Sequence, residues 1–167
     1  MEKNMNTLRE ELLQELPEFE RKTKQFIQKE ISMKEYKGYS GGFGSYAQRG
    51  GEAFIRMNQG RITKEKLKFI IDQCQEHGIV RTHCTTCQTV QLHDVRPEAL
   101  TPIMKEALER DIVTRGGGGD YPRNVMCSVL TGLDPEEAFD VYPYAKVAGE
   151  YLLSIVNKYS LPRKLKV

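Results

Sequence analysis

The sequence has no tryptophan, only four cysteines and no long apolar run. A helix that crosses a membrane needs about 20 predominantly apolar residues, and no stretch of this chain comes near that length. The first residues, Met1 to Glu11, are charged and polar, so they do not form the apolar region of a secretion signal. We therefore expect a cytoplasmic protein that does not associate with a membrane.

A large excess of charge of one sign is also missing. The 25 Lys and Arg residues nearly balance the 23 Asp and Glu residues, which gives a formal net charge of +2. Proteins that bind nucleic acids usually carry a strongly basic surface, so this composition gives no reason to expect a nucleic-acid partner. The 167 residues, of which 39% are hydrophobic, suffice for one domain with a full core, or for one domain and an appendage.

The cysteines are Cys74, Cys84, Cys87 and Cys127. In a cytosolic protein such residues are more often reduced thiols or ligands than disulfides. Cys84-x-x-Cys87 lies beside His83, with His77 and His93 nearby, but a structural zinc site normally has a second ligand pair, and no second Cys-x-x-Cys exists. A redox pair opens a helix after a strand, whereas this pair lies between two β-rich segments. We therefore predict no metal site in this chain.

The first part of the chain is predicted to be helical. Residues 5–31 carry leucine, phenylalanine and isoleucine at helical spacing, with charges on the other face, and Pro17 predicts a break between two helices. We expect this pair to cover the domain or an oligomer surface. Between Lys37 and Glu52, six glycines are mixed with aromatic residues, which predicts turns or a bulged hairpin.

The next part is predicted to alternate strands and helices in the order β-α-β-β-α-β. The predicted elements are a strand at Ala53–Met57, a helix from the N-cap Thr63 to Gly78, strands at Ile79–Cys84 and Thr89–Val95, a helix that starts at Pro97, and a strand at Ile112–Thr114. This is the order of the ferredoxin-like motif, in which two helices cover one face of an antiparallel sheet. The expected fold class is α+β, with the other face of the sheet left free.

The last part begins with four consecutive glycines, 116–119. A phosphate-binding loop would continue into Gly-Lys-Ser/Thr and a helix, and both are missing, so a backbone close to a flat ligand, or a mobile loop, explains the glycines better. Asp134-Pro135-Glu136-Glu137 predicts the start of a helix to about Tyr159, because acidic residues suit a first turn. A strand begins at Leu161 and stops with the chain, so we expect an incomplete second domain.

The segment from Thr85 to His93 is the least easily explained by packing. If it is extended, Thr85, Cys87, Thr89, Gln91 and His93 share one face. A half-polar strand is usually just solvent-facing, but the glutamines, the histidine and the thiol of this segment suit a large polar ligand that lies across a sheet.

This segment, with Arg123-Asn124-Val125 and the final 161–166 run Leu-Pro-Arg-Lys-Leu-Lys, resembles the sirohaem-containing nitrite and sulfite reductases. That family carries a Thr-x-Arg-Gln-x-x-Gln-x-His strand, an Arg-Asn-Val turn and a Leu-Pro-Arg-Lys-x-Lys strand in the same order. Residues 44–49 also resemble its Gly-x-x-x-Gln-Arg segment. The resemblance implies a helical arm over 1–36, a ferredoxin-like half domain over 37–115, and the start of the sirohaem and 4Fe-4S catalytic domain over 116–167.

The resemblance also implies site residues. The active-site cations would be Arg56, Arg123, Lys164 and Lys166, and the sirohaem-binding residues would be Thr85, Cys87, Thr89, Gln91 and Asn124. Cys87 departs from the family, which normally has an arginine that binds sirohaem carboxylates at this position. Arg81 and Arg115 are the candidates to replace that charge. The cysteines that hold the 4Fe-4S cluster, in Cys-x5-Cys and Cys-x3-Cys arrangements, are expected beyond the end of this chain.

The implied function is the six-electron reduction of sulfite to sulfide or of nitrite to ammonia. Its partners would be sulfite or nitrite, an electron donor such as ferredoxin or a flavoprotein, and the rest of the reductase polypeptide, without which the chain should be inactive. The alternative is a noncatalytic ferredoxin-like module that binds a ligand or RNA. RNA recognition of the usual kind needs exposed aromatic residues on the central strands, and 79–84 and 89–95 contain none.

Overall fold

The computed structural model of the chain describes residues 2–46, 52–55, 61–116, 124–155, 159 and 165. Its elements are the helices α1 (Glu2–Ile27), α2 (Met33–Ser40), α3 (Lys64–His77), α4 (Pro97–Glu109) and α5 (Tyr142–Ile155), the 3-10 helix η1 (Gly41–Phe43), and the strands β1 (Ser45–Tyr46), β2 (Glu52–Ile55), β3 (Thr82–Cys84) and β4 (Val90–Leu92). None of the helices described is both long enough and apolar enough to cross a membrane. The glycines 117–119 and the predicted strand from Leu161 lie outside the part of the chain that the structure describes, apart from Leu165.

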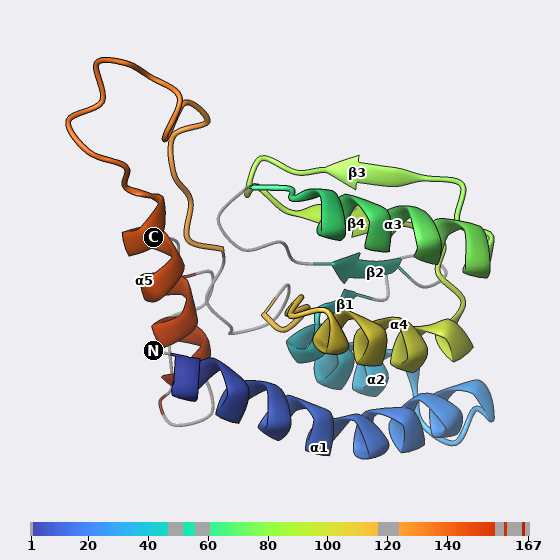
Figure 1. The fold of residues 1–167 in the computed structure, drawn as a ribbon. Coiled ribbons are helices and arrows are strands. Elements are labelled where there is room, and N and C mark those ends of the chain that lie inside the picture. Colours follow the sequence, from blue (N-terminus) through green and yellow to red (C-terminus); the bar gives the residue numbers. More distant parts are fainter. Residues whose placement is uncertain are drawn as a thin grey trace.

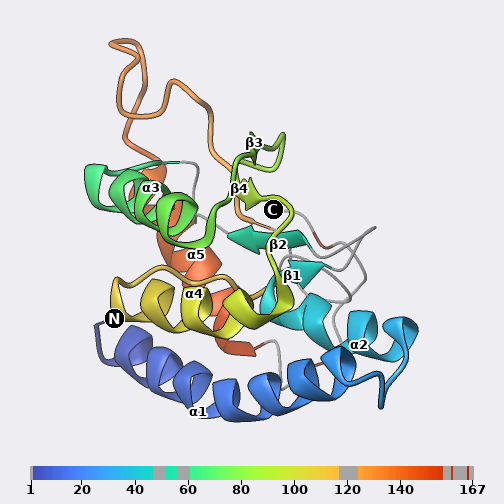
Figure 2. The same cartoon turned by 90° about the vertical axis from the view of Figure 1, so that its right-hand side faces the viewer.

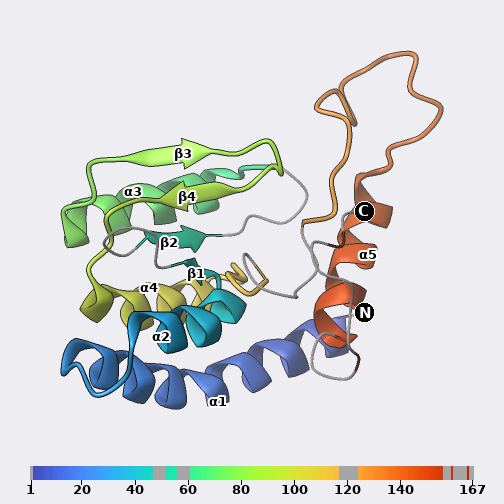
Figure 3. The same ribbon diagram turned by 180° about the vertical axis from the view of Figure 1, so that it is seen from behind.

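The four strands form one antiparallel sheet in the order β1-β2-β4-β3. Helices α3 and α4 lie side by side across one face of this sheet (Figure 1). Seen from behind, β2, β3 and β4 face the viewer, with no described helix in front of them (Figure 3). This is the predicted α+β arrangement, with two helices on one face and an open second face.

Local sequence chemistry sets the ends of α3 and α4 as predicted. The hydroxyl of Thr63 accepts a hydrogen bond from the backbone N–H of Lys66 at 3.3 Å, so it caps the start of α3. Gly78 ends α3 in the left-handed conformation, with φ +66°, which a residue without a Cβ adopts at little cost. Pro97 lies in the first turn of α4, where its missing N–H leaves no helical hydrogen bond unmade.

The hydrophobic core lies between the sheet and these helices and continues to α1. Val90 and Leu92 are buried beneath α3 and α4, and the apolar stripe of α4 that the sequence predicted is buried as well. On its other side α4 packs against α1, which runs along it (Figure 2). The buried apolar residues that α1 contributes are Leu8, Leu12, Leu16 and Phe19. The N-terminal helix therefore covers the domain.

The predicted break at Pro17 is wrong, because α1 is one continuous helix through this residue. Proline removes one backbone N–H and costs about 3 kcal/mol in a helix interior. Pro17 itself is exposed, whereas Leu16 and Phe19 on either side are buried. Burial of this apolar stripe therefore outweighs the tendency of proline to break a helix. The second helix of the arm, α2, begins only after Ser32.

The predicted strand at Ile112–Thr114 does not form. The edge of the sheet beside β2 is occupied by β1 instead. The hydroxyl of Thr114 donates to the carbonyl of Phe43 at 3.0 Å, and the N–H of Gly116 donates to the carbonyl of Gly42 at 3.1 Å. The segment is therefore held beside η1 by its own hydrogen bonds and stays out of the ladder.

The last helix starts at Tyr142, eight residues after the predicted start at Asp134. A carboxylate oxygen of Asp134 accepts from the N–H of Glu136 at 2.9 Å, and one of Glu137 accepts from the N–H of Gly132 at 2.6 Å. These acidic side chains therefore stabilise turns and do not begin a helix. Asp140 accepts from the N–H of Tyr142 at 2.9 Å at the true start of α5.

Residues 85–89 form the hairpin turn between β3 and β4, so the prediction of one extended row from Thr85 to His93 is wrong. The N–H of Thr85 donates to the carbonyl of Thr89 at 2.8 Å, and the N–H of Gln88 donates to the carbonyl of Thr85 at 3.0 Å. Gln88 has φ +52°, which turns the chain back. Of the predicted row, only Gln91 lies on a strand.

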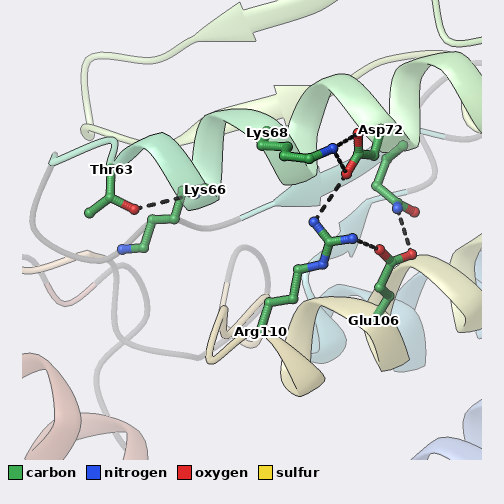
Figure 4. Close-up of polar contacts among 7 residues, drawn as sticks. Thr63, Lys66, Lys68, Asp72, Glu106 and Arg110 are labelled. Carbon is green, nitrogen blue, oxygen red and sulfur yellow. Dashed lines mark hydrogen bonds and ion pairs between the residues drawn. The ribbon is translucent and has the colours of Figure 1, made fainter.

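A polar network joins α3 to α4 (Figure 4). The fully buried Gln73 donates from Nε2 to Oε2 of Glu106 at 2.7 Å. Arg110 contacts both Glu106 and Asp72, and Asp72 also binds Lys68 at 2.7 Å. These contacts hold α3 and α4 in one position relative to each other on the sheet.

Candidate functional site

A cavity of about 420 Å³ lies beside the hairpin turn. Its walls come from the turn, from the residues just before α3, from the loop 127–133 and from the start of α5. Ile62, Val90, Val129 and Leu133 supply apolar surface, and Thr85, Thr89, Thr131 and Arg61 supply polar groups. Cavities of this size, mostly apolar with a few polar groups, are typical of small-molecule sites.

The structure brings two of the predicted cofactor-binding residues together in this cavity. The hydroxyl oxygens of Thr85 and Thr89 lie 2.7 Å apart, and the N–H of Thr89 donates to the hydroxyl of Thr85 at 3.3 Å. Both residues are half-buried and line the cavity. Closure of the turn therefore places the two hydroxyls side by side, which an extended strand would not do.

The turn is tied to residues 124–127, almost forty positions later in the chain. Nε2 of Gln88 donates to the carbonyl of Cys127 at 2.7 Å, and Oε1 of Gln88 accepts from the N–H of Cys127 at 3.2 Å. Nδ2 of Asn124 donates to the carbonyls of Cys87 and Gln88 at 3.1 and 3.2 Å. The structure thus uses the amide of Asn124 to hold the turn, and its predicted contact with a cofactor stays a prediction.

Gln88 was not among the predicted site residues, because alternation along a strand places it on the face opposite Thr85 and Thr89. The sequence did contain a sign of its importance, since Gln88 occupies the glutamine position of the Thr-x-Arg-Gln motif quoted above.

The other predicted cofactor-binding residues, all within the described part of the chain, are not among those that line the cavity. Cys87 lies in the turn and is half-buried. Gln91 lies between the buried Val90 and Leu92 on β4, so its side chain faces the open side of the sheet. Gln91 is the partner of His83 in the pairing of β3 with β4. The centroids of the His83 and His93 rings lie 6.2 Å apart. The predicted cofactor-binding residues therefore divide between the cavity, the turn and the open face.

The predicted active-site cations Arg56, Arg123, Lys164 and Lys166 lie outside the described residues. Their roles stay predictions.

The two arginines expected to replace the charge missing at Cys87 are held elsewhere. Arg81 forms an ion pair with Asp94 at 3.0 Å. Arg115 is 8% exposed, binds Glu15 of α1 and lies over the ring of Phe43, with Cζ 4.8 Å from its centroid. Both arginines are therefore already paired with carboxylates, and their predicted replacement of the missing charge stays a prediction.

Arg61 is a cation of the cavity wall that the sequence did not reveal. Its Nη2 donates to the carbonyl of Thr131 at 3.1 Å and lies 3.6 Å from a carboxylate oxygen of Asp140. Its Cζ lies 3.9 Å from the centroid of the Tyr142 ring, which is a cation–π contact. Its partners lie 70 to 81 positions away in the chain, so no local pattern could have identified it.

The thiol of Cys127 also lines the cavity and stays protonated at neutral pH. Burial raises its pKa, the charge of Arg61 lowers it, and the carboxylates of Asp140 and Glu137 raise it.

In the described ranges 2–46, 52–55, 61–116 and 124–155, no three His, Cys, Asp or Glu side chains are grouped so that they could hold a metal ion. All four cysteines are free thiols.

Comparisons with known proteins match two consecutive stretches of the chain to two family models. Residues 46–110 match the model of the nitrite/sulfite reductase ferredoxin-like half domain, and residues 118–167 match that of the nitrite and sulphite reductase 4Fe-4S domain. The sulfite reductase (NADPH) hemoprotein beta-component of Oceanobacillus iheyensis is 30% identical over 108 residues, which are 63% of this chain and 18% of that protein. The beta-component 1 of Pectobacterium carotovorum subsp. carotovorum is 30% identical over 110 residues, 64% of this chain and 19% of that protein.

The fold is similar to that of the Mycobacterium tuberculosis NirA protein, with a TM-score of 0.66 and 22% identity. The likeness covers 82% of this chain and 29% of that one. Together with the match over 46–110, it confirms the predicted ferredoxin-like half domain. The aligned part of this chain spans less than a fifth of the length of the two curated relatives.

Proposed function

The chain belongs to the nitrite and sulfite reductase family, and on this premise we propose that it forms one wall of the cavity that holds sirohaem and the substrate anion. The observation that carries the proposal is the consecutive match to the half domain and to the 4Fe-4S domain. The hairpin turn of the first matched region and residues 124–127 of the second are joined by the hydrogen bonds of Gln88 and Asn124. The cavity lies at this junction.

The chemistry of the cavity fits sirohaem. This cofactor is a flat tetrapyrrole with eight carboxylates, and an unpaired carboxylate in a site of low dielectric constant is costly. Thr85 and Thr89 supply hydroxyls, Arg61 supplies a guanidinium group, and the apolar wall suits a flat ring. These residues would therefore bind one side of the cofactor and its acidic arms.

The proposed reaction is the six-electron reduction of sulfite to sulfide, or of nitrite to ammonia. Two of the relatives are named sulfite reductases, so sulfite is the substrate we favour. When bound, sirohaem and a coupled 4Fe-4S cluster would pass electrons from the external donor to the substrate. We assign the cluster ligands to residues outside this chain, because its four cysteines lack the Cys-x5-Cys and Cys-x3-Cys spacings. On this proposal the chain alone is inactive.

Within this reductase, Arg56, Arg123, Lys164 and Lys166 would bind the substrate anion and help to deliver the protons that the reaction consumes. The electron donor would be a ferredoxin or a flavoprotein, and the four free thiols favour a reducing, cytoplasmic setting. The alternative of a noncatalytic ligand- or RNA-binding module is not favoured by the family matches.

The first test is to add sirohaem to the purified protein and to record its visible spectrum. We expect a saturable change in the absorption bands of the tetrapyrrole. A spectrum identical to that of free sirohaem at all protein concentrations would contradict the proposed cofactor.

The second test concerns the cations. In the intact reductase, Arg56→Ala and Arg123→Ala should each lower kcat/KM for sulfite by about tenfold or more, because each removes a charged hydrogen bond to the anion. Arg21→Ala is the matched control, because Arg21 is an exposed arginine of α1 that pairs with Glu18. If either variant turns over sulfite as fast as the wild type, the assignment of that arginine to the site is contradicted.

A further inference from the structure

We propose that Arg61, Thr131 and the Thr85–Thr89 hydroxyl pair form a binding subsite for one oxyanion group, such as a carboxylate of the tetrapyrrole or a free sulfite ion. All four residues line the cavity of about 420 Å³. The inference rests on the proposed function for the source of the carboxylate, but the oxyanion chemistry follows from the residues themselves.

Arg61 supplies the positive charge of this subsite. Within the part of the chain that the structure describes, the guanidinium group makes one hydrogen bond, from Nη2 to the carbonyl of Thr131. A guanidinium group carries five N–H donors in a rigid fork, so most of them stay available to a ligand with two oxygen acceptors. The ring of Tyr142 fixes the plane of the group, since Cζ lies 3.9 Å from its centroid.

Thr131 supplies an independent observation that points to a ligand site here. Its side chain is buried, with only 7% of the residue exposed, and its Oγ1 has no hydrogen-bond partner within the described part of the chain. A buried hydroxyl without a partner costs about 1–3 kcal/mol, and most buried polar side-chain atoms do have a partner from the protein, a water or an ion. Thr131 lines the cavity, and an oxyanion there would accept its hydrogen bond.

The Thr85–Thr89 pair supplies a further donor. The two hydroxyl oxygens lie 2.7 Å apart, so one hydroxyl donates to the other. The hydroxyl that accepts this hydrogen bond still has its own O–H, which can donate to a ligand. The cavity therefore offers hydrogen-bond donors from three segments of the chain, and an anion that leaves water needs such donors.

Gly132 allows the guanidinium group to lie where it does. A Cβ built on this residue would lie 2.5 Å from Nη2 of Arg61, closer than real Cβ contacts, and Gly132 has φ +74°. Any larger residue here would displace the guanidinium group from the cavity wall.

Asp140 competes with the ligand. Its carboxylate lies 3.6 Å from Nη2 of Arg61, which is too far for a good hydrogen bond but close enough for a Coulomb attraction. The same carboxylate accepts from the N–H of Tyr142 at 2.9 Å, a bond that an asparagine oxygen can also accept. Asp140→Asn therefore removes the competing charge and keeps the cap.

The test is to measure dissociation constants of the full chain, by spectrophotometric titration with sirohaem and by calorimetric titration with sodium sulfite and sodium acetate, at one fixed ionic strength. Arg61→Ala should weaken binding about ten- to one hundredfold, and Thr131→Val by about fivefold, because they remove a charged and a neutral hydrogen bond. Asp140→Asn should tighten binding about twofold or more, since it removes a neighbouring negative charge.

Two controls accompany these variants. Arg21→Ala removes an exposed arginine of α1, and Thr82→Val makes the same change as Thr131→Val on an exposed residue of β3, so neither should change binding. If Arg61→Ala fails to fold, Thr131→Val and Asp140→Asn still decide the matter, because both keep the hydrogen bond from Arg61 to the backbone of residue 131.

The outcomes separate this inference from the proposed function. Weaker binding by Thr131→Val and tighter binding by Asp140→Asn support the subsite, and the titration in which they occur identifies a cofactor carboxylate or a free oxyanion as the ligand. Sirohaem that binds equally well to all variants overturns the subsite and leaves the cofactor assignment standing. Wild-type protein that binds sulfite through Arg61 but not sirohaem overturns the cofactor assignment alone. Absence of binding in every titration overturns both.

Discussion

Gln73 shows how a single polar residue sets the geometry of the interface between α3 and α4. It is fully buried, and its Nε2 donates to Glu106, which Arg110 also binds. A buried amide that loses its partner retains the full cost of leaving water. The contact therefore favours one relative position of the two helices over other apolar packings.

Glu106→Ala should lower the free energy of unfolding by about 1–3 kcal/mol, because it leaves the N–H groups of Gln73 buried and unsatisfied. Lys68→Ala is the control: Lys68 is 71% exposed and only pairs with Asp72, so its loss should cost less than about 0.5 kcal/mol. Urea denaturation of both variants measures the difference. Equal costs for the two substitutions would show that the buried contact has no special weight.

Tyr39 should make the stability of the arm depend on alkaline pH. Burial, followed by the charges of Glu18 and Glu15, raises the pKa of its phenol from 10.0 to about 12, against the opposing effect of Arg115 and Arg21. Because the folded-state pKa is the higher one, the stabilisation is fully present below pH 10 and is lost as the pH rises towards about 12.

Tyr39→Phe removes this titration, so its free energy of unfolding should fall less than that of the wild type between pH 10 and about 12. Chemical denaturation at both ends of this pH range measures the slope of the free energy of unfolding against pH. Tyr151→Phe, at an exposed residue of α5, should leave the slope of the wild type unchanged. Identical slopes for wild type and Tyr39→Phe would refute the assignment.

At the scale of elements, α1 tolerates a proline in its interior because its neighbours in the helix are buried against α4. Pro17→Ala should raise the free energy of unfolding by about 1–2 kcal/mol, since it restores a helical hydrogen bond and removes a steric clash, offset by the greater freedom of the unfolded chain. Gln14→Ala, at another exposed position of α1, serves as the control and should change little. A lower thermal unfolding temperature for Pro17→Ala would contradict this account.

The hairpin turn and residues 124–127 behave as one unit, because Gln88 and Asn124 each reach across to the backbone of the other segment. Asn124 is 3% exposed, so Asn124→Ala should cost about 1–3 kcal/mol of unfolding free energy.

A double-mutant cycle with Gln88→Ala should show a coupling of about 0.5–3 kcal/mol, because either substitution loosens the contact that the other depends on. Thr86→Ala, at an exposed residue of the same turn, should couple to neither. Strictly additive costs in urea denaturation would mean that the two bonds act independently.

At the scale of the whole molecule, the departure at Cys87 bears on how strongly the protein holds its cofactor. A thiol cannot supply the charge of the arginine that the family normally has there, and Arg81 and Arg115 are bound to Asp94 and Glu15. We expect Cys87→Arg to bind sirohaem about tenfold more tightly, as a charged hydrogen bond to a carboxylate predicts.

Spectrophotometric titration of this variant measures the effect. Thr86→Arg adds the same charge at the neighbouring exposed position and should change the affinity much less. If both variants gain the same affinity for sirohaem, the added net charge explains the effect, and an arginine at position 87 does not contact the cofactor specifically.

The sequence predicted the parts of the fold that depend on neighbouring residues. Thr63 and Gly78 define the ends of α3, and Pro97 defines the start of α4, because caps and turns are made by side chains within a few positions of one another. Motifs in a fixed order also predicted the family, which the two family matches confirm. They pointed to Thr85 and Thr89, which line a cavity, and the binding of a cofactor by these two residues stays a prediction.

Only the tertiary structure decided where distant segments meet. Burial against α4 kept α1 continuous through Pro17, β1 took the sheet edge expected for Ile112–Thr114, and the turn at 85–89 replaced an extended row. Arg61 and Thr131 came together across 70 positions of chain. The physical reason is that periodicity and capping report local preferences of about 1 kcal/mol or less per residue, whereas buried apolar surface and hydrogen bonds between remote segments contribute more and appear only once the chain has folded.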